Sequence, residues 1–282
     1  MWESIRVSQR PCYYIRNHRP VWVAAPVDGG AARSGASRSA RVSDPRVKLL
    51  SHGDTALAVE FGERIDRAVS ERVLALHDRL VQALPPGVVE LVPTFRSLMV
   101  HYDPLRTSRA QLSQVLERML PGLEGVRPAA RRWSIPVCYD PPCGLDLREV
   151  ASRTGLAPAD VVARHSAVVY HVYMIGFTPG YPYMGDLPVE LALPRREDPR
   201  TQVPAGSVAI ATAMTAVYTL QSPGGWHILG RTPVPLWSLR RSPPSLLAPG
   251  DKVRFVPIGM DEYERIVRQA EAGDLALQPE AA

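Results

Sequence analysis

Cysteine is scarce in this chain of 282 residues. The three present are Cys12, Cys138 and Cys143, an odd number that gives no disulfide framework. Cys138 and Cys143 are separated by four residues, and no second pair stands near them, so we expect no metal site. The cysteine content fits a protein of the reducing cytoplasm.

The sequence also lacks an apolar run long enough to span a membrane, although its apolar content of 45% is ordinary for a globular protein. The formal net charge of +5 does not describe the whole chain, because residues 1–46 contain eight arginines against Glu3, Asp28 and Asp44 and so carry the entire excess. A nucleic-acid-binding body would have a basic face of its own. We therefore expect neither a nucleic acid nor a membrane as partner.

Three common catalytic motifs are missing as well. Without GxxxxGK[ST], the chain has no Walker-type phosphate loop of its own. Without GxSxG or HExxH, it has neither a nucleophile elbow nor the helix of a zinc protease. Any catalysis must depend on a less generic arrangement of residues.

The first 45 residues differ in composition from the rest. Segment 24–45 is rich in alanine, serine and arginine and has no hydrophobic period of 2 or 3.6. We interpret residues 1–45 as a disordered leader with no part in the chemistry. The segment has neither the amphipathic face of a transit peptide nor the apolar core of a secretory signal. We prefer to explain it as an overextended translation start, with the true start near Val42.

Residues 46–122 have the pattern of a small α+β domain. VKLLSHGDTALAVEFG predicts two short strands around a turn at Gly53, and a helix is expected from about Asp66 to Pro85. VVELVP and FRSLMVHY predict two further strands. Ser108, with Gln111 three residues later, is typical of a capping box at the start of a second helix. Two strands followed by a helix, and then the same again, form an α+β order.

Strands dominate residues 130–260, after a linker at Pro121–Arg132. RWSIPVCY is the first, and two short helices follow it, the second beginning near Pro158. From Val168 onward the candidate strands are VVYHVYMI, SVAIA, AVYTLQ, WHILG, PLWSL and KVRFVP, most of them separated by Gly/Pro turns. This pattern favours a mainly-β domain that closes as a barrel or sandwich. Residues 261–282 are expected to form a charged helix and a frayed tail.

The stretch from His171 to Thr232 contains three Gly/Pro-rich loops beside these strands. Glycines in the first loop permit conformations that other residues avoid and let the backbone approach a ligand, while aromatic side chains stand between them. A loop specified this tightly is more often a binding wall than a spacer. A rigid turn packed on the end of a barrel would have the same composition. The residues concerned are Gly176, Phe177, Pro179, Gly180, Tyr181, Pro182, Tyr183 and Gly185.

Arginines in the other loops are candidates for binding an anion. Arg195, Arg196 and Arg200 stand among prolines, and Arg231 follows the WHILG strand. A planar guanidinium suits carboxylate or phosphate, although each arginine could equally be a solvated charge.

The turn from Ser222 to Gly225 offers backbone N–H groups for an anion nest or is a plain hairpin. We place Arg200 and this turn on one anion-binding surface, with the Arg200 guanidinium free for the anion. We expect Gly225 to need a positive φ or a close approach of the ligand. His227, beside Trp226, could move protons or make a structural hydrogen bond.

Three segments together carry a specific resemblance. VYMIGFTPGYPYMG, LPRREDPRTQVPAGSVAIA and SPGGWHILGRTP closely resemble the allophanate-hydrolase-subunit-1 family, and GDTALAVEFG and VPTFRSLMVHYDP resemble its amino-terminal domain. The similarity runs from about Val47 to Ile258. CYDPPCG departs from the family pattern, and the leader lies outside it. Members include the B subunit of the prokaryotic ATP-dependent 5-oxoprolinase and the kinase inhibitor KipI, with related domains in urea amidolyase and urea carboxylase.

The resemblance implies a small α+β domain followed by a cyclophilin-like β-barrel. It further implies a B subunit that works with subunits C and A to open 5-oxo-L-proline to L-glutamate, using ATP with Mg²⁺ as co-substrate and no prosthetic group. In this setting we predict that His227, Arg200 and Arg231 are catalytic. We predict substrate or nucleotide binding by Gly176, Phe177, Thr178, Pro179, Gly180, Tyr183, Arg195, Pro204, Gly206, Ser207, Ser222, Gly224, Gly225, Trp226 and Thr232.

Other functions remain open at this point. The chain could be a KipI-like protein that inhibits a sensor histidine kinase without turnover, or a component of a urea-amidolyase-related carboxyltransferase or allophanate hydrolase. Prolyl isomerase activity, suggested by the barrel alone, is a weaker alternative because fold does not imply function. The arginines and glycine-rich loops favour the 5-oxoprolinase component.

Overall fold

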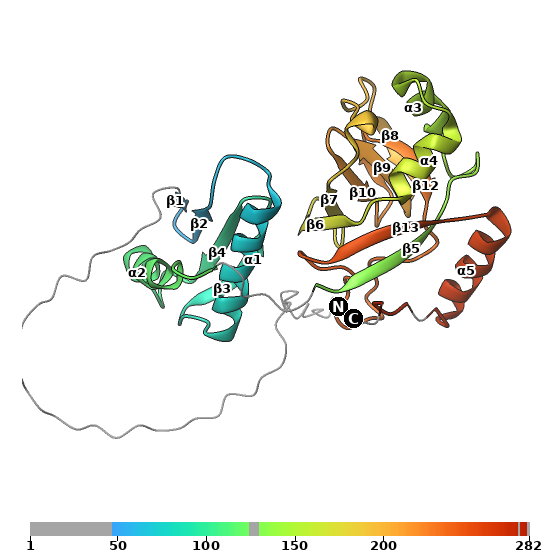
Figure 1. Ribbon diagram of the computed structural model, residues 1–282. Helices are drawn as coiled ribbons and strands as arrows, with labels where there is room; N and C mark the ends of the chain where they lie inside the picture. Colours follow the sequence, from blue (N-terminus) through green and yellow to red (C-terminus); the bar gives the residue numbers. More distant parts are fainter. Residues whose placement is uncertain (1–46, 124–129, 276, 281–282) are drawn as a thin grey trace, which may run out of the picture.

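The computed structural model describes residues 47–123, 130–275 and 277–280 (Figure 1). The predicted leader, residues 1–45, lies outside the described residues, as do residues 124–129 of the linker. No helix in the described ranges is both long enough and apolar enough to cross a membrane.

The N-terminal part has the strand and helix order that the sequence predicts. Its elements are β1 (Lys48–His52), β2 (Ala56–Glu60), α1 (Arg67–Gln82), β3 (Val88–Pro93), β4 (Ser97–Tyr102) and α2 (Arg109–Met119). The strands form an antiparallel sheet in the order β1-β2-β4-β3. The Asp66 side chain caps α1 by accepting from the N–H groups of Ala68 and Val69. The capping box of Ser108 and Gln111 at the start of α2 is confirmed.

The second part is a closed barrel of seven strands in the order β10-β7-β6-β13-β5-β12-β9. Only β13 and β5 run parallel; the other barrel pairs are antiparallel. The barrel strands are β5 (Arg132–Cys138), β6 (Tyr170–Ile175), β7 (Pro182–Gly185), β9 (Ser207–Ala211), β10 (Met214–Val217), β12 (His227–Arg231) and β13 (Lys252–Ile258). A separate two-stranded sheet pairs β8 (Arg200–Val203) with β11 (Ser222–Gly224).

Three α-helices and a 3-10 turn complete this part. They are α3 (Leu147–Thr154), α4 (Pro158–Ser166), η1 (Val189–Leu191) and α5 (Met260–Ala272). Pro158 opens α4, as expected.

Two sequence-based expectations are wrong here. PLWSL is not a strand, and its one sheet-like contact is an isolated bridge between Trp237 and Ser245. The tail is not frayed over residues 277–280, because Leu277 packs against the barrel core and the N–H of Glu280 donates to the Arg132 carbonyl at 2.8 Å.

Alternation along the strands divides the apolar side chains between two cores. Every barrel strand contributes to the interior core, for example Val208 and Ile210 of β9. The intervening residues Ala209 and Ala211 face outward and belong to a second core with Trp226 and Tyr218, covered by the β8–β11 pair. The short side chains of these alanines let the small sheet approach the barrel wall.

One buried histidine joins α4 to the barrel interior. The Thr215 hydroxyl donates to the Ala209 carbonyl at 3.2 Å, so its oxygen accepts from His165 Nε2 at 3.0 Å. His165 Nδ1 must then accept from the Tyr139 hydroxyl, 2.9 Å away. Burial lowers the pKa of His165 to about 3, which keeps the ring neutral.

The N-terminal part contacts the barrel through α1 and the β3–β4 turn. Ser70 Oγ lies 3.1 Å from His171 Nε2, and both residues are buried. Phe95 packs against Tyr173 and Tyr183, with ring centroids 6.1 and 5.6 Å apart. The glycine-rich loops of the barrel therefore stand beside this junction.

Candidate functional site

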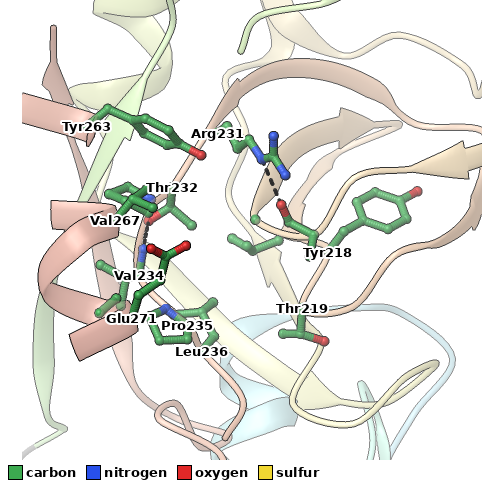
Figure 2. A pocket seen from close by; sticks show the side chains of 15 residues that line it. Tyr218, Thr219, Arg231, Thr232, Val234, Pro235, Leu236, Tyr263, Val267 and Glu271 are labelled. Atoms are coloured by element: carbon green, nitrogen blue, oxygen red, sulfur yellow. Dashed lines mark hydrogen bonds between the residues drawn. The ribbon is translucent and has the colours of Figure 1, made fainter. Parts of the chain in front are cut away.

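A pocket of about 290 Å³ lies between α5 and the loops at one end of the barrel (Figure 2). Gly206, Arg231 and Thr232, three of the residues predicted from sequence, line it. Figure 2 shows Arg231, Tyr218 and Thr219 bordering the space from the barrel side, opposite Tyr263, Val267 and Glu271 of α5. We call this space the α5 pocket.

Gly206 brings two walls of the α5 pocket together. Its N–H donates to the Tyr218 carbonyl at 2.6 Å, and its own carbonyl accepts from the Thr232 N–H at 2.9 Å. Its φ is +82°, and a Cβ at this position would stand 2.5 Å from the Thr232 carbonyl oxygen. Only glycine meets both conditions, so the VPAGS sequence fixes how Tyr218 and Thr232 face the pocket.

The Arg231 guanidinium makes a hydrogen bond within the protein through Nε, and its two terminal nitrogens remain available to a ligand. Its Nε donates to the Ala205 carbonyl at 2.8 Å. Within the described residues, no carboxylate lies within 4 Å of its guanidinium, and no other hydrogen bond engages it. The side chain is half-buried. Arg231 can therefore donate to an anion in the pocket without breaking an ion pair.

Helix α5 supplies the opposite wall. Tyr263, Val267 and Glu271 are spaced by four residues and so share one helix face. Burial raises the pKa of Tyr263, against the smaller opposing influence of the Arg231 charge, so its hydroxyl stays protonated and able to donate. Glu271 makes no ion pair with another described residue, whereas Glu262 and Arg265 pair on the exposed side of the helix.

The predicted loop at residues 176–180 adjoins the α5 pocket through Thr219. The Thr219 hydroxyl donates to the Pro179 carbonyl at 2.7 Å and lies 3.3 Å from the Thr178 hydroxyl. Gly180 has a φ of +73°, and a Cβ there would meet Trp237 at 3.0 Å. Phe177 also has a positive φ, +66°, and is 62% exposed.

Aromatic rings continue from this loop across the outer face of the barrel. Tyr181 contacts Tyr218 at 5.2 Å and Tyr183 at 5.0 Å between ring centroids, and Tyr183 contacts Trp226 at 6.0 Å. Burial raises the pKa of each of these tyrosines, while the nearby Arg195 charge acts in the opposite direction. Arg195 is exposed and forms no ion pair with another described residue.

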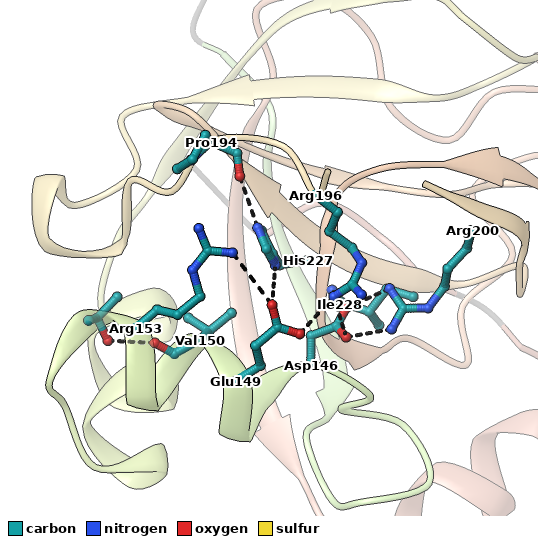
Figure 3. Close-up of polar contacts among 10 residues, drawn as sticks. Asp146, Glu149, Val150, Arg153, Pro194, Arg196, Arg200, His227 and Ile228 are labelled. Atoms are coloured by element: carbon teal, nitrogen blue, oxygen red, sulfur yellow. Dashed lines mark hydrogen bonds and ion pairs between the residues drawn. The ribbon is translucent and has the colours of Figure 1, made fainter. Parts of the chain in front are cut away.

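Arg200 is engaged within the protein, which corrects the expectation of a guanidinium free for an anion. Its Nη1 donates to Asp146 Oδ2 at 2.8 Å and its Nη2 donates to Oδ1, a bidentate pair (Figure 3). Asp146, at the start of α3, is 2% exposed and also accepts from the Ile228 N–H at 2.7 Å. The pair therefore ties α3 to β8 and β12.

Arg196 joins the same cluster. Its Nη1 lies 3.3 Å from Asp146 Oδ1 and 2.7 Å from Glu149 Oε2. The Arg196 hydrogen bond is the main reason why the pKa of Glu149 is lowered. The structure thus separates the arginines that the sequence left equivalent, because Arg196 and Arg200 neutralise carboxylates while Arg195 and Arg231 do not.

His227 belongs to this cluster and not to the α5 pocket. It is fully buried, and its Nε2 donates to the Pro194 carbonyl at 2.9 Å. Its Nδ1 has no hydrogen-bond partner in the part of the chain that the structure describes, and it lies 3.9 Å from Glu149 Oε1 (Figure 3). The structure gives His227 the structural hydrogen bond that was its alternative role, and catalysis by His227 stays a prediction.

The turn after β11 is tight at Gly224 and not at Gly225. A Cβ on Gly224 would stand 2.1 Å from the Tyr218 hydroxyl oxygen, whereas one on Gly225 would meet Pro199 at an ordinary 3.5 Å. Gly225 has no positive φ, so that part of the expectation is wrong, and the close approach of a ligand to Gly225 stays a prediction. The Gly225 carbonyl accepts from the Arg196 N–H at 2.8 Å.

The other predicted residues stand close to these features. Ser207 is buried, and its N–H contacts the Pro204 carbonyl at 3.3 Å. The buried hydroxyl of Ser222 has no hydrogen-bond partner among the described residues. No group of three or more His, Cys, Asp or Glu side chains in the described ranges could hold a metal ion.

Sequence reasoning missed five residues that define these surfaces: Asp146, Glu149, Tyr218, Tyr263 and Glu271. The spacing of Tyr263, Val267 and Glu271 was a usable signal, because it places an aromatic and an acidic residue on one helix face. Asp146 and Glu149, by contrast, are about 50 residues from their arginine partners in the sequence, and nothing local pairs them.

Comparisons with known proteins agree with the sequence resemblance. Residues 47–247 match the model of the carboxyltransferase domain, subdomains C and D. The chain is 37% identical over 229 residues to the 5-oxoprolinase B subunit of Bacillus subtilis, covering 77% of this chain and 95% of that protein. It is 41% identical over 212 residues to the 5-oxoprolinase B subunit of Escherichia coli O157:H7, covering 75% and 96%.

Solved structures give a similar result. TTHA0988 superposes with a TM-score of 0.66 at 43% identity, covering 72% of this chain, which spans only 40% of the TTHA0988 chain. The urea carboxylase of Kluyveromyces lactis superposes with a TM-score of 0.67 at 20% identity, covering 84% of this chain and 24% of that one. At that identity the likeness is one of fold alone.

Proposed function

The chain belongs to the carboxyltransferase subdomain C and D family, and from its similarity to the B subunits within that family we propose that it is the B subunit of an ATP-dependent 5-oxoprolinase. The main support is identity of 37–41% that extends over 95–96% of the length of two such proteins. The reaction would open 5-oxo-L-proline to L-glutamate, and its partners would be subunits C and A. The barrel would be of the cyclophilin-like type and the complex cytoplasmic.

The chemistry explains the need for ATP. An unstrained amide resists water at neutral pH, so transfer of the γ-phosphoryl group to the lactam oxygen, with release of ADP, would activate the carbonyl carbon. Water then adds to that carbon and the C–N bond breaks, with the ring nitrogen taking up protons, which leaves an acyl phosphate. A second water would hydrolyse this acyl phosphate to the free carboxylate of glutamate and inorganic phosphate. Because the sequence has no Walker loop, ATP with Mg²⁺ would bind at a site of another kind or on a partner protein.

Arg195 and Arg231, which form no ion pair with another described residue, fit this role. Both 5-oxoproline and ATP are anions, and guanidinium groups bind carboxylate and phosphate well. Arg231 lies in the α5 pocket and Arg195 beside the aromatic rings, and each is adjacent to predicted loop residues. Arg200 and His227 would contribute by holding β8, β12 and α3 in place.

Reconstitution tests this proposal. Purified alone, the chain should show no ATP hydrolysis that depends on 5-oxoproline. Mixed with its cognate subunits C and A, it should release glutamate and ADP in equal amounts, measured by amino-acid analysis and a coupled ADP assay. If the complete, folded mixture releases no glutamate, the KipI-like regulatory role becomes the better explanation, and binding to a sensor kinase should then be measured.

A further inference from the structure

The α5 pocket carries two opposite charges that have no partner within the described chain. Arg231 uses only Nε internally, and Glu271 forms no ion pair with a described residue. Both line the same space from facing walls (Figure 2). If they could reach each other they would pair, yet no contact within 4 Å joins them. The space between them can hold a ligand that has both an anionic group, to accept from Arg231, and an N–H group, to donate to Glu271.

The remaining lining of the α5 pocket is apolar or hydroxylated. Val217, Val234, Leu236 and Val267 supply aliphatic surface. Thr232 Oγ1 already accepts from the Val234 N–H at 3.2 Å, so that hydroxyl is fixed in place. The Tyr263 hydroxyl adds a donor on the α5 side. Such a mixture suits a small ring with methylene groups and a few polar atoms.

We propose that the α5 pocket binds the carboxylate of a small cyclic amide acid on Arg231, with the ring N–H donating to Glu271. The ring methylenes would contact the valine and leucine side chains, and Tyr263 would donate to the remaining polar atom of the ligand. This assignment rests on the proposed function for its ligand, 5-oxo-L-proline. It makes α5, which lies outside the matched residues 47–247, a part of the substrate site.

Calorimetry with two ligands tests the assignment on the full chain. 5-Oxo-L-proline should bind, whereas 2-pyrrolidinone, which lacks the carboxylate, should bind at least tenfold more weakly. Arg231→Gln should raise the Kd of 5-oxo-L-proline at least tenfold and leave that of 2-pyrrolidinone unchanged. Glu271→Gln should weaken both, because both ligands have the ring N–H.

Arg268→Gln is the matched control, because Arg268 is exposed on α5 and, among the described residues, its ion-pair partner is Glu264 alone. It should bind 5-oxo-L-proline as the wild type does. Where the isolated chain binds too weakly for calorimetry, the KM of the reconstituted complex replaces the Kd. A wild-type complex that turns over while Arg231→Gln and Glu271→Gln keep the wild-type KM would overturn the site and leave the function standing. If 5-oxo-L-proline binds in an Arg231-dependent way but the reconstituted complex releases no glutamate, the site would stand and the proposed function would be overturned.

Discussion

Asp146 is the residue on which the charge cluster at α3 depends. It is almost fully buried, and it accepts from Arg200, Arg196 and the Ile228 backbone. A buried carboxylate in this position compensates two guanidinium groups, and its loss would leave them partly desolvated without a counter-charge. We therefore expect its loss to lower the stability of the fold.

Replacing Asp146 by asparagine tests that role. Asp146→Asn keeps the size of the side chain and removes the charge, so we expect a loss of about 3 kcal/mol in the free energy of unfolding. Urea denaturation measures it. Asp160→Asn, at an exposed position in the first turn of α4, serves as the control and should change little. An unchanged midpoint for Asp146→Asn would mean that the two arginines are adequately solvated.

The sequence alone could not tell which arginines pair with carboxylates of the same chain and which are available to a ligand. Residue type predicts that a guanidinium will find an anion, but whether that anion is a ligand or a carboxylate of the same chain depends on tertiary contacts. The partners of Arg200 and Arg231 differ only because β8 packs beside α3, while the end of β12 opens into the α5 pocket. Local pattern identified the four candidates, and only the fold divided them.

At the scale of elements, the turn between β11 and β12 gives a sharp comparison. Gly224→Ala would drive a methyl group to 2.1 Å from the Tyr218 hydroxyl, whereas Gly225→Ala makes only an ordinary contact with Pro199. We expect the first substitution to lower the melting temperature by several degrees and the second to be nearly neutral. A fall of that size corresponds to about 1–2 kcal/mol in a domain of this size.

Thermal melts of the two variants, followed by circular dichroism, decide the matter. Equal melting temperatures would show that Tyr218 moves aside at little cost, in which case its place in the wall of the α5 pocket is not fixed by the turn. A larger fall for Gly225→Ala would support the constraint that the sequence predicts for that residue.

Elements with strong local signals were predicted well. The capping box of α2, the start of α4 at a proline and most barrel strands follow from residue patterns in the sequence. PLWSL failed because Pro235 lacks a donor for a ladder and the chain turns back through the following proline-rich segment. The ordered tail could not be foreseen, since its contacts with Arg132 and Ser134 join residues that are far apart in the sequence.

At the scale of the whole molecule, the N-terminal α+β part and the barrel contact each other beside the predicted loop at residues 176–180. Ser70 and His171 contact each other across that junction, and Phe95 reaches the tyrosines of the barrel. The sequence predicted the α+β order and the strand-rich second half, and their exact domain boundaries remain predictions. It did not predict that α5 would return to the barrel and face Arg231, because closure of the α5 pocket is a tertiary event.

We propose that Arg231 binds the substrate, whereas Arg200 stabilises the fold. The most direct test compares Arg231→Lys with Arg200→Lys in the reconstituted complex, with the KM for 5-oxo-L-proline and the melting temperature measured on the same preparations. Lysine keeps the charge and loses the planar fork.

Arg231→Lys should raise the KM about tenfold, a loss of about 1.4 kcal/mol, with an unchanged melting temperature. Arg200→Lys should lower the melting temperature by several degrees, about 1.5–3 kcal/mol for a charged hydrogen bond, with an unchanged KM. The opposite assignment, a raised KM in a fully stable Arg200→Lys and a normal KM in Arg231→Lys, would contradict the account.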